Sequence, residues 1–127
     1  MGNTDESHES SLPAGAIFVH TDERSGAVLV AVAGEVDLVT APRLRAAVDD
    51  ALARLAGRTL VLDLSGVTFF GSPGLHILAA TATRVREAGG AAGLRVVATR
   101  AALRPIQITG LDVLIRLYET AEETLDD

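Results

Sequence analysis

A serine between a glycine and a proline is the side chain in this sequence best placed for chemistry. Ser72 lies in the run Gly71-Ser72-Pro73-Gly74, directly before a segment with helical periodicity. The nucleophile elbow of a serine hydrolase needs glycine two residues before and two residues after the serine, and Phe70 occupies the first of these positions. A hydrolase also needs a base, and none of the histidines is convincingly placed for that role. A serine hydrolase is therefore the disfavoured alternative, and we expect that the chain is not an enzyme.

The other polar residues offer no metal or nucleotide site. The chain has no cysteine, and His8, His20 and His76 are too scattered for a ligand motif. No phosphate-binding loop of the G-x-x-x-x-G-K-[ST] type is present. A net charge of −6 has the wrong sign for a protein that neutralises nucleic acid or anionic lipid. We therefore expect no cofactor, no nucleic-acid partner and no membrane partner.

The elements that position Ser72 are predicted from hydrophobic periodicity. Residues 17–20 and 27–33 are apolar segments separated by turn residues, which predicts a β-hairpin. A helix follows, with Thr40 as its N-cap and Pro42 in its first turn, and it ends near Gly57. Its apolar face consists of Leu44, Ala47, Val48, Ala51, Leu52 and Leu55.

A buried strand and a second helix lie on either side of Ser72. Residues 59–64 are almost continuously apolar, which is typical of a central strand that Ser65-Gly66 would end. Helical spacing then runs from Ser72 to Gly89-Gly90. We expect Ser72 to be the N-cap of this helix, because Pro73 at its first position favours extended backbone at Ser72. The apolar face of the helix consists of Leu75, Leu78, Ala82 and Val85.

The last third of the chain continues the alternation of strands and helices. Residues 94–98 predict a strand, and Thr99 caps a helix that Pro105 should keep short or kinked. Residues 113–117 predict a last strand and residues 119–125 an acidic terminal helix. The predicted order is β-β-α-β-α-β-α-β-α, which favours crossover connections. The fold class is therefore α/β, a mixed β-sheet covered by helices.

Composition along the chain predicts one domain after a short tail. Residues 1–15 are polar and acidic, so we expect a mobile tail, with or without a regulatory role, before a domain at residues 16–127. The start of the chain lacks the basic and apolar regions of a secretory signal. No apolar stretch approaches the roughly 20 residues that a membrane-spanning helix needs. We expect a cytoplasmic protein.

Three stretches resemble the STAS domain family. Residues 34–37, Gly-Glu-Val-Asp, followed by Thr40, resemble the G-E-[LV]-D element that leads into the first helix of that family. Residues 61–75 are similar to its strand–loop–helix signature, D-L-[SG]-x-[VL]-x-F-[IML]-D-S-[ST]-G-L. Residues 109–111 resemble the [ST]-G-L that follows its third helix. The likeness extends over residues 17–125.

The resemblance implies a STAS fold and the role of an anti-sigma-factor antagonist. In this family the unphosphorylated antagonist binds an anti-sigma factor that has serine kinase activity, and a sigma factor is thereby released. Phosphorylation of a serine, which matches Ser72 here, ends that binding. A serine phosphatase is a further implied partner. The residues predicted to bind the partner are Glu35, Asp37, Gly71, Pro73 and Gly74.

The match departs from the family pattern on both sides of Ser72. The usual aspartate before the phosphoacceptor is Gly71, and the usual serine or threonine after it is Pro73. Loss of the carboxylate removes a charge that could orient the kinase or the hydroxyl. The alternative function is therefore a constitutive, unphosphorylated STAS scaffold. Glu35 and Asp37 should lie in a loop at the same end of the sheet as Ser72. There they either pair with basic residues of a partner kinase or form a solvated loop in which Asp37 assists the turn.

Overall fold

The computed structural model describes residues 15–90 and 93–126, and its centre is a five-stranded sheet in the order β2-β3-β4-β5-β6. An antiparallel hairpin consists of β2 (Ile17–Glu23) and β3 (Ala27–Val36). The remaining strands run parallel to β3 and to one another: β4 (Thr59–Phe70), β5 (Arg95–Val97) and β6 (Arg116–Tyr118). The predicted hairpin and the mixed sheet are confirmed.

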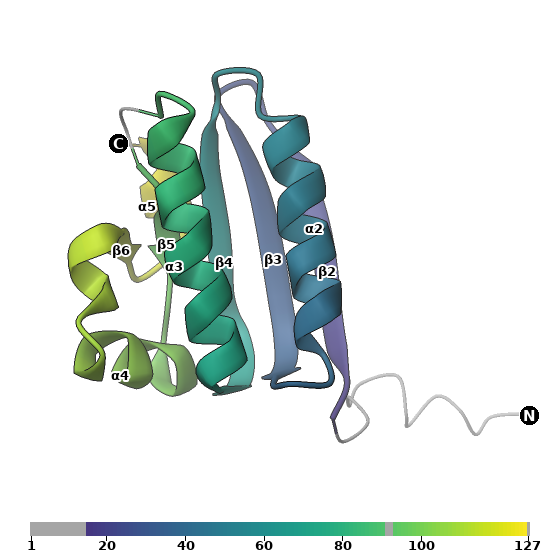
Figure 1. Ribbon diagram of the computed structural model, residues 1–127. Helices are drawn as coiled ribbons and strands as arrows, with labels where there is room; N and C mark the ends of the chain where they lie inside the picture. Colours follow the sequence, from purple (N-terminus) through teal and green to yellow (C-terminus); the bar gives the residue numbers. More distant parts are fainter. Residues whose placement is uncertain (1–14, 91–92, 127) are drawn as a thin grey trace, which may run out of the picture.

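The helices cover the sheet unequally (Figure 1). The helices α2 (Ala41–Ala53) and α3 (Ser72–Glu87) lie side by side on one face, and α4 (Arg100–Ile108) packs into the same core. A 3-10 helix, η1 (Leu111–Leu114), leads into β6. The short α5 (Ala121–Asp126) lies on the opposite face, where Ala121 packs against residues of three strands. The predicted α/β class and element order are confirmed, and η1 is added.

Alternation along the central strand separates the two cores. In β4, Leu60, Leu62 and Leu64 point into the main core beneath α2 and α3, whereas Val61 belongs to the small core near α5. This is the period of two expected of strand side chains. The predicted helical faces are also confirmed, because Leu44, Val48, Ala51, Leu78, Ala82 and Val85 are all buried.

The end of the central strand was predicted wrongly. β4 continues past Ser65 and Gly66 to Phe70, with irregular register against β3 near Ala33. A Cβ at Gly66 would lie 3.0 Å from the Cβ of Ala33 and 3.2 Å from the carbonyl oxygen of Val32. The glycine therefore permits close approach of two strands at a bulge, which a sequence pattern does not distinguish from a turn.

In the C-terminal third of the chain, the last strand begins later than predicted. Residues 111–114 form η1, so the last strand begins only at Arg116 rather than at Val113. The helix α4 is short, as expected, with Pro105 inside it, and Gly110 adopts a left-handed φ of 78° just after its end. The predicted tail at residues 1–15 lies outside the described residues except for Gly15. Within the described ranges no helix is long and apolar enough to cross a membrane.

Candidate functional site

The ends of two parallel strands bring the predicted site residues together. Val36, the last residue of β3, is in register with Phe70, the last residue of β4. The N–H of Gly71 donates to the Val36 carbonyl at 2.9 Å, which joins the two chain segments beyond the strands. Both α2 and α3 begin at this edge of the sheet (Figure 1). The segment from Glu35 to Asp37 is therefore adjacent to the segment that carries Ser72.

Ser72 is exposed at the first position of α3. Gly71, not Ser72, is the N-cap, with extended φ and ψ of −90° and −176° and a carbonyl that accepts the N–H groups of Gly74 at 3.0 Å and Leu75 at 3.2 Å. Pro73 consequently occupies the second helical position. The predicted cap role of Ser72 is wrong, because the residue before proline can still join the helix when proline lies in the first turn.

The loop before α2 is organised by Asp37. Its Oδ1 accepts the N–H groups of Val39 and Thr40, each at 3.0 Å. Thr40 is the N-cap residue of α2, as predicted, but its hydroxyl makes no bond into the helix. The hydroxyl donates to the Glu35 carbonyl at 2.7 Å and accepts the Asp37 N–H at 3.0 Å. The carboxylate of Asp37 thus stabilises the turn. Its contact with a partner, like that of Glu35, stays a prediction.

Gly74 allows α3 to approach the strand ends. A Cβ here would lie 2.8 Å from both Phe70 Cε1 and Val36 Cγ1, and both side chains are buried. Gly74 is itself buried, in contrast to the exposed Ser72. The absence of a side chain at Gly74 therefore lets the first turn of α3 pack closely against the strand ends, and this packing sets the position of Ser72.

Gly71 lies beneath an aromatic ring. A Cβ at Gly71 would lie 3.0 Å from Phe69 Cε2 and 3.4 Å from the Val36 carbonyl oxygen. The aspartate of the family pattern would therefore need the Phe69 ring to move. The ring is 52% exposed, so it has room to do so.

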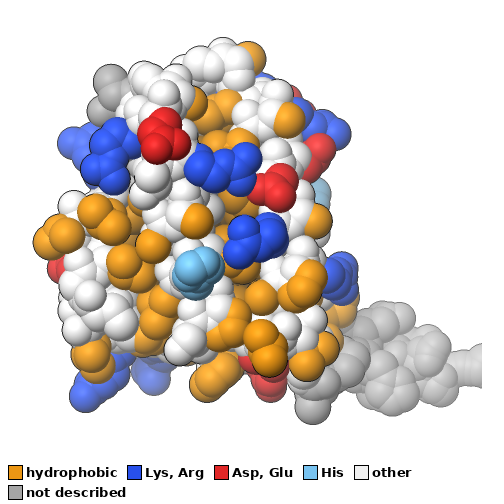
Figure 2. Space-filling model, in the orientation of Figure 1, with side chains coloured by type: hydrophobic (Ala, Val, Ile, Leu, Met, Phe, Trp, Pro, Cys, Tyr) orange, Lys and Arg blue, Asp and Glu red, His pale blue; other side chains and the backbone are white. Residues whose placement is uncertain are grey.

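Three exposed apolar side chains at this edge were missed by sequence reasoning. Leu38 and Val39 in the loop are 80% and 83% exposed, and Phe69 next to Gly71 is 52% exposed. We call these three residues the apolar rim. Figure 2 shows hydrophobic side chains at the edge where α2 and α3 begin. A signal was available, because large aliphatic residues between Asp37 and Thr40 are unusual in a polar turn.

The described residues around Ser72 lack the parts of a hydrolase. His76 lies one turn further along α3 and is exposed, yet no hydrogen bond joins it to Ser72 or to a carboxylate within the described part of the chain. A nucleophilic serine needs such an oriented base. Among residues 15–90 and 93–126 no group of histidine and acidic side chains is suited to hold a metal ion.

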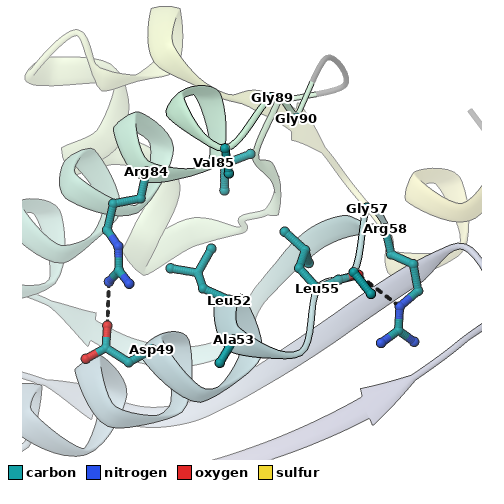
Figure 3. A pocket seen from close by; sticks show the side chains of 12 residues that line it. Asp49, Leu52, Ala53, Leu55, Gly57, Arg58, Arg84, Val85, Gly89 and Gly90 are labelled. Atoms are coloured by element: carbon teal, nitrogen blue, oxygen red, sulfur yellow. Dashed lines mark hydrogen bonds and ion pairs between the residues drawn. The ribbon is translucent and has the colours of Figure 1, made fainter.

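A separate pocket lies at the other end of the helix pair (Figure 3). It has a volume of about 410 Å³ and lies between the C-terminal ends of α2 and α3. Arg84 forms an ion pair with Asp49 at 2.5 Å, and Arg58 donates to the Leu55 carbonyl at 3.1 Å. Its arginines thus have partners within the chain, and the pocket is remote from Ser72.

Comparison with known proteins gives one family. The model of the STAS domain family matches residues 19–124. The chain is 38% identical to the anti-sigma-F factor antagonist RsfB of Mycobacterium tuberculosis over 111 aligned residues. The alignment covers 87% of this chain and 88% of that protein.

Two solved structures of other proteins have the same fold as this chain. A crystal structure of an anti-sigma factor antagonist from Mycobacterium paratuberculosis has a TM-score of 0.81 at 42% identity, covering 91% of this chain and 97% of the other. The phosphorylated form of SpoIIAA, a Bacillus cell fate determinant, shares the fold with a TM-score of 0.59 at 20% identity, covering 86% and 97% of the two chains.

Proposed function

The chain belongs to the STAS domain family, and on this premise we propose that it is an anti-sigma-factor antagonist. We infer that it binds an anti-sigma factor with serine kinase activity through the surface around Ser72, and that phosphorylation of Ser72 ends the binding. The names of RsfB and of the Mycobacterium paratuberculosis protein support the role of antagonist. A serine phosphatase would restore the active form.

The observation that carries this proposal is the setting of Ser72. An exposed hydroxyl at the start of α3 lies at the edge of the sheet that also carries the apolar rim of Leu38, Val39 and Phe69. Exposed apolar side chains that gather at one edge are typical of a protein-binding surface. A kinase can reach the hydroxyl, and a partner that covers the rim also covers the hydroxyl.

The modification transfers one phosphoryl group. The Ser72 oxygen attacks the γ-phosphorus of ATP, the bond from that phosphorus to the β-γ bridging oxygen breaks, and ADP leaves. The hydroxyl proton passes to a base that the kinase supplies. The product carries about −1.5 to −2 charge at neutral pH.

Phosphate at this position acts on the partner more than on the fold. The positive end of the α3 dipole favours an anion by about 0.3–1 kcal/mol. Pro73 has no N–H, and the N–H groups of Gly74 and Leu75 already donate to Gly71, so the first turn offers the phosphate few donors. Desolvating the charge within an apolar, partly acidic interface costs several kcal/mol, and about 1.4 kcal/mol is a tenfold loss of affinity.

One observation favours the alternative, a constitutive scaffold that is not phosphorylated. Gly71 supplies no carboxylate next to Ser72, and the Phe69 ring lies where such a side chain would begin. In that case the same surface binds its partner without a switch.

Intact-protein mass spectrometry tests the proposal against this alternative. The purified chain is incubated with ATP and the anti-sigma kinase of its own organism, and the expected product carries one phosphate. Ser72→Ala should abolish the mass increase. Ser65→Ala is the matched control, because Ser65 is also an exposed serine, on β4. Single-site labelling that persists in Ser72→Ala would remove Ser72 from the mechanism, and no labelling of the native chain would favour the scaffold.

A further inference from the structure

A buried arginine lies at the end of the sheet opposite Ser72. Arg95 is the first residue of β5 and is only 8% exposed. Arginine is rarely buried to this extent unless another group pairs with its charge. Within the part of the chain that the structure describes, no ion pair involves Arg95. Its charge therefore lacks a counter-ion there.

The contacts of the guanidinium leave one edge unused. Nη1 donates to the Thr124 carbonyl of α5 at 2.5 Å, and the ring of Tyr118 lies 5.9 Å from Cζ. Nε is buried and has no hydrogen-bond partner among the described residues, and no hydrogen bond of Nη2 is found among them. Unlike Nε, Nη2 is not closed off from solvent, so its hydrogens can donate to an oxygen of a carboxylate or phosphate.

A pocket of about 460 Å³ adjoins this arginine. Its polar side chains come from the turn between β2 and β3, the start of β4, the start of β5 and α5: Arg24, Ser25, Thr59, Arg95 and Thr124. No acidic side chain lines it among the described residues, although the whole chain has a net charge of −6. The volume falls within the range of roughly 300–1,000 Å³ that is usual for small-ligand sites.

The two arginines that line the pocket differ in whether their charge is already paired. The Arg24 guanidinium is half exposed and pairs with Asp22 at 2.8 Å, so its charge is already balanced. Arg95 is buried, and its side chain is held by β5, Tyr118 and α5. Such a fixed, poorly hydrated guanidinium is the preferred group for binding a planar or tetrahedral oxyanion.

The anchoring of α5 accounts for only one of the three nitrogens of the Arg95 guanidinium. The bond to Thr124 uses Nη1 alone. We propose that the pocket binds a small ligand through a carboxylate or phosphate group, to which Nη2 of Arg95 and the hydroxyls of Ser25 and Thr59 donate. This site is independent of the proposed binding surface at Ser72, because the two lie at opposite ends of the parallel strands.

The Nε–H of Arg95 can be observed directly by NMR of the 15N-labelled full chain at slightly acidic pH. Inorganic phosphate and acetate are titrated separately, each against sodium chloride of equal ionic strength. We expect at least one of the two anions to shift the Arg95 Nε–H signal and the Gly26 and Thr59 amides to saturation. The tighter-binding anion identifies the ligand group. If neither anion shifts the Arg95 signal beyond the chloride control, the proposal is wrong and Arg95 is a structural anchor.

Three variants separate binding from folding. Arg95→Gln should abolish saturable binding, but it also removes the anchor of α5. Thr59→Val keeps Arg95 and its bond to Thr124, and should weaken binding about two- to tenfold through one lost hydrogen bond. Arg104→Gln is the matched control, because Arg104 is exposed on α4. Equal weakening in Arg104→Gln and Arg95→Gln would show diffuse attraction of anions and overturn the site.

Discussion

Replacing Val39 by alanine should weaken anti-sigma-factor binding without destabilising the fold. The Val39 side chain is 83% exposed, so almost all of its apolar surface is available for burial by a partner. Valine to alanine removes two carbon groups, and about 0.8 kcal/mol per buried CH₂ gives about 1.5 kcal/mol, or roughly a tenfold rise in Kd. The free energy of unfolding should change by less than about 0.5 kcal/mol. Calorimetric titration and urea denaturation measure the two quantities.

Val113→Ala provides the matched control for this measurement. Val113 is 82% exposed in η1, a different segment from those that carry the apolar rim, so the substitution is the same and the exposure nearly so while the location differs. We expect its Kd to equal that of the native chain. An unchanged Kd for Val39→Ala, or an equal rise for Val113→Ala, would refute the assignment of the apolar rim to the binding surface.

Three further substitutions have defined outcomes. Ser72→Ala should alter the free energy of unfolding by less than about 0.5 kcal/mol in urea denaturation, because the hydroxyl caps no helix. Gly74→Ala should lower the Tm, since overpacking costs about 1–3 kcal/mol and replacing a helical glycine gains at most about 1 kcal/mol; an unchanged Tm would contradict the close packing. Hydrogen bonds from Arg58 and Arg54 hold the pKa of the Glu23 carboxyl below its ordinary value of 4.5, so its contribution to stability is present above that pH and is lost as the pH falls through the lowered pKa. Glu23→Gln should therefore reduce the loss in free energy of unfolding at acid pH, measured by urea denaturation across a pH series. An unaltered loss would exclude the two hydrogen bonds as its cause.

The sequence predicted the sheet and the adjacency of the site residues, because both depend on periodicity and on parallel strand order. Asp37 and Ser72 follow strands that alternate with helices, so their strands were expected to end at one edge. The helix starts were predicted less well. At Ser72 the cap shifted by one residue to Gly71, whose carbonyl accepts two N–H groups. At Thr40 the N-cap position is as predicted, but the hydroxyl bonds backward to Glu35 instead of forward into the helix.

The apolar rim and the Arg95 pocket depend on tertiary contacts that periodicity does not encode. Hydrophobicity alone does not separate Val39, which is 83% exposed, from Val36, which is fully buried three residues earlier. Likewise, the pattern of β5 places Arg95 in a strand but does not show that Tyr118 and α5 enclose it. Such features follow from how elements distant in sequence meet.

The central claim is that charge at Ser72 controls partner binding. Its most direct test compares the affinity of one anti-sigma factor, in fluorescence titration, for the unmodified chain, Ser72→Asp and the Ser72-phosphorylated chain, with circular dichroism confirming that all three are folded. A carboxylate carries about half the charge of a phosphate, so we expect affinity to fall in that order. Equal affinity of the phosphorylated and unmodified proteins would contradict the switch and leave the constitutive scaffold in its place.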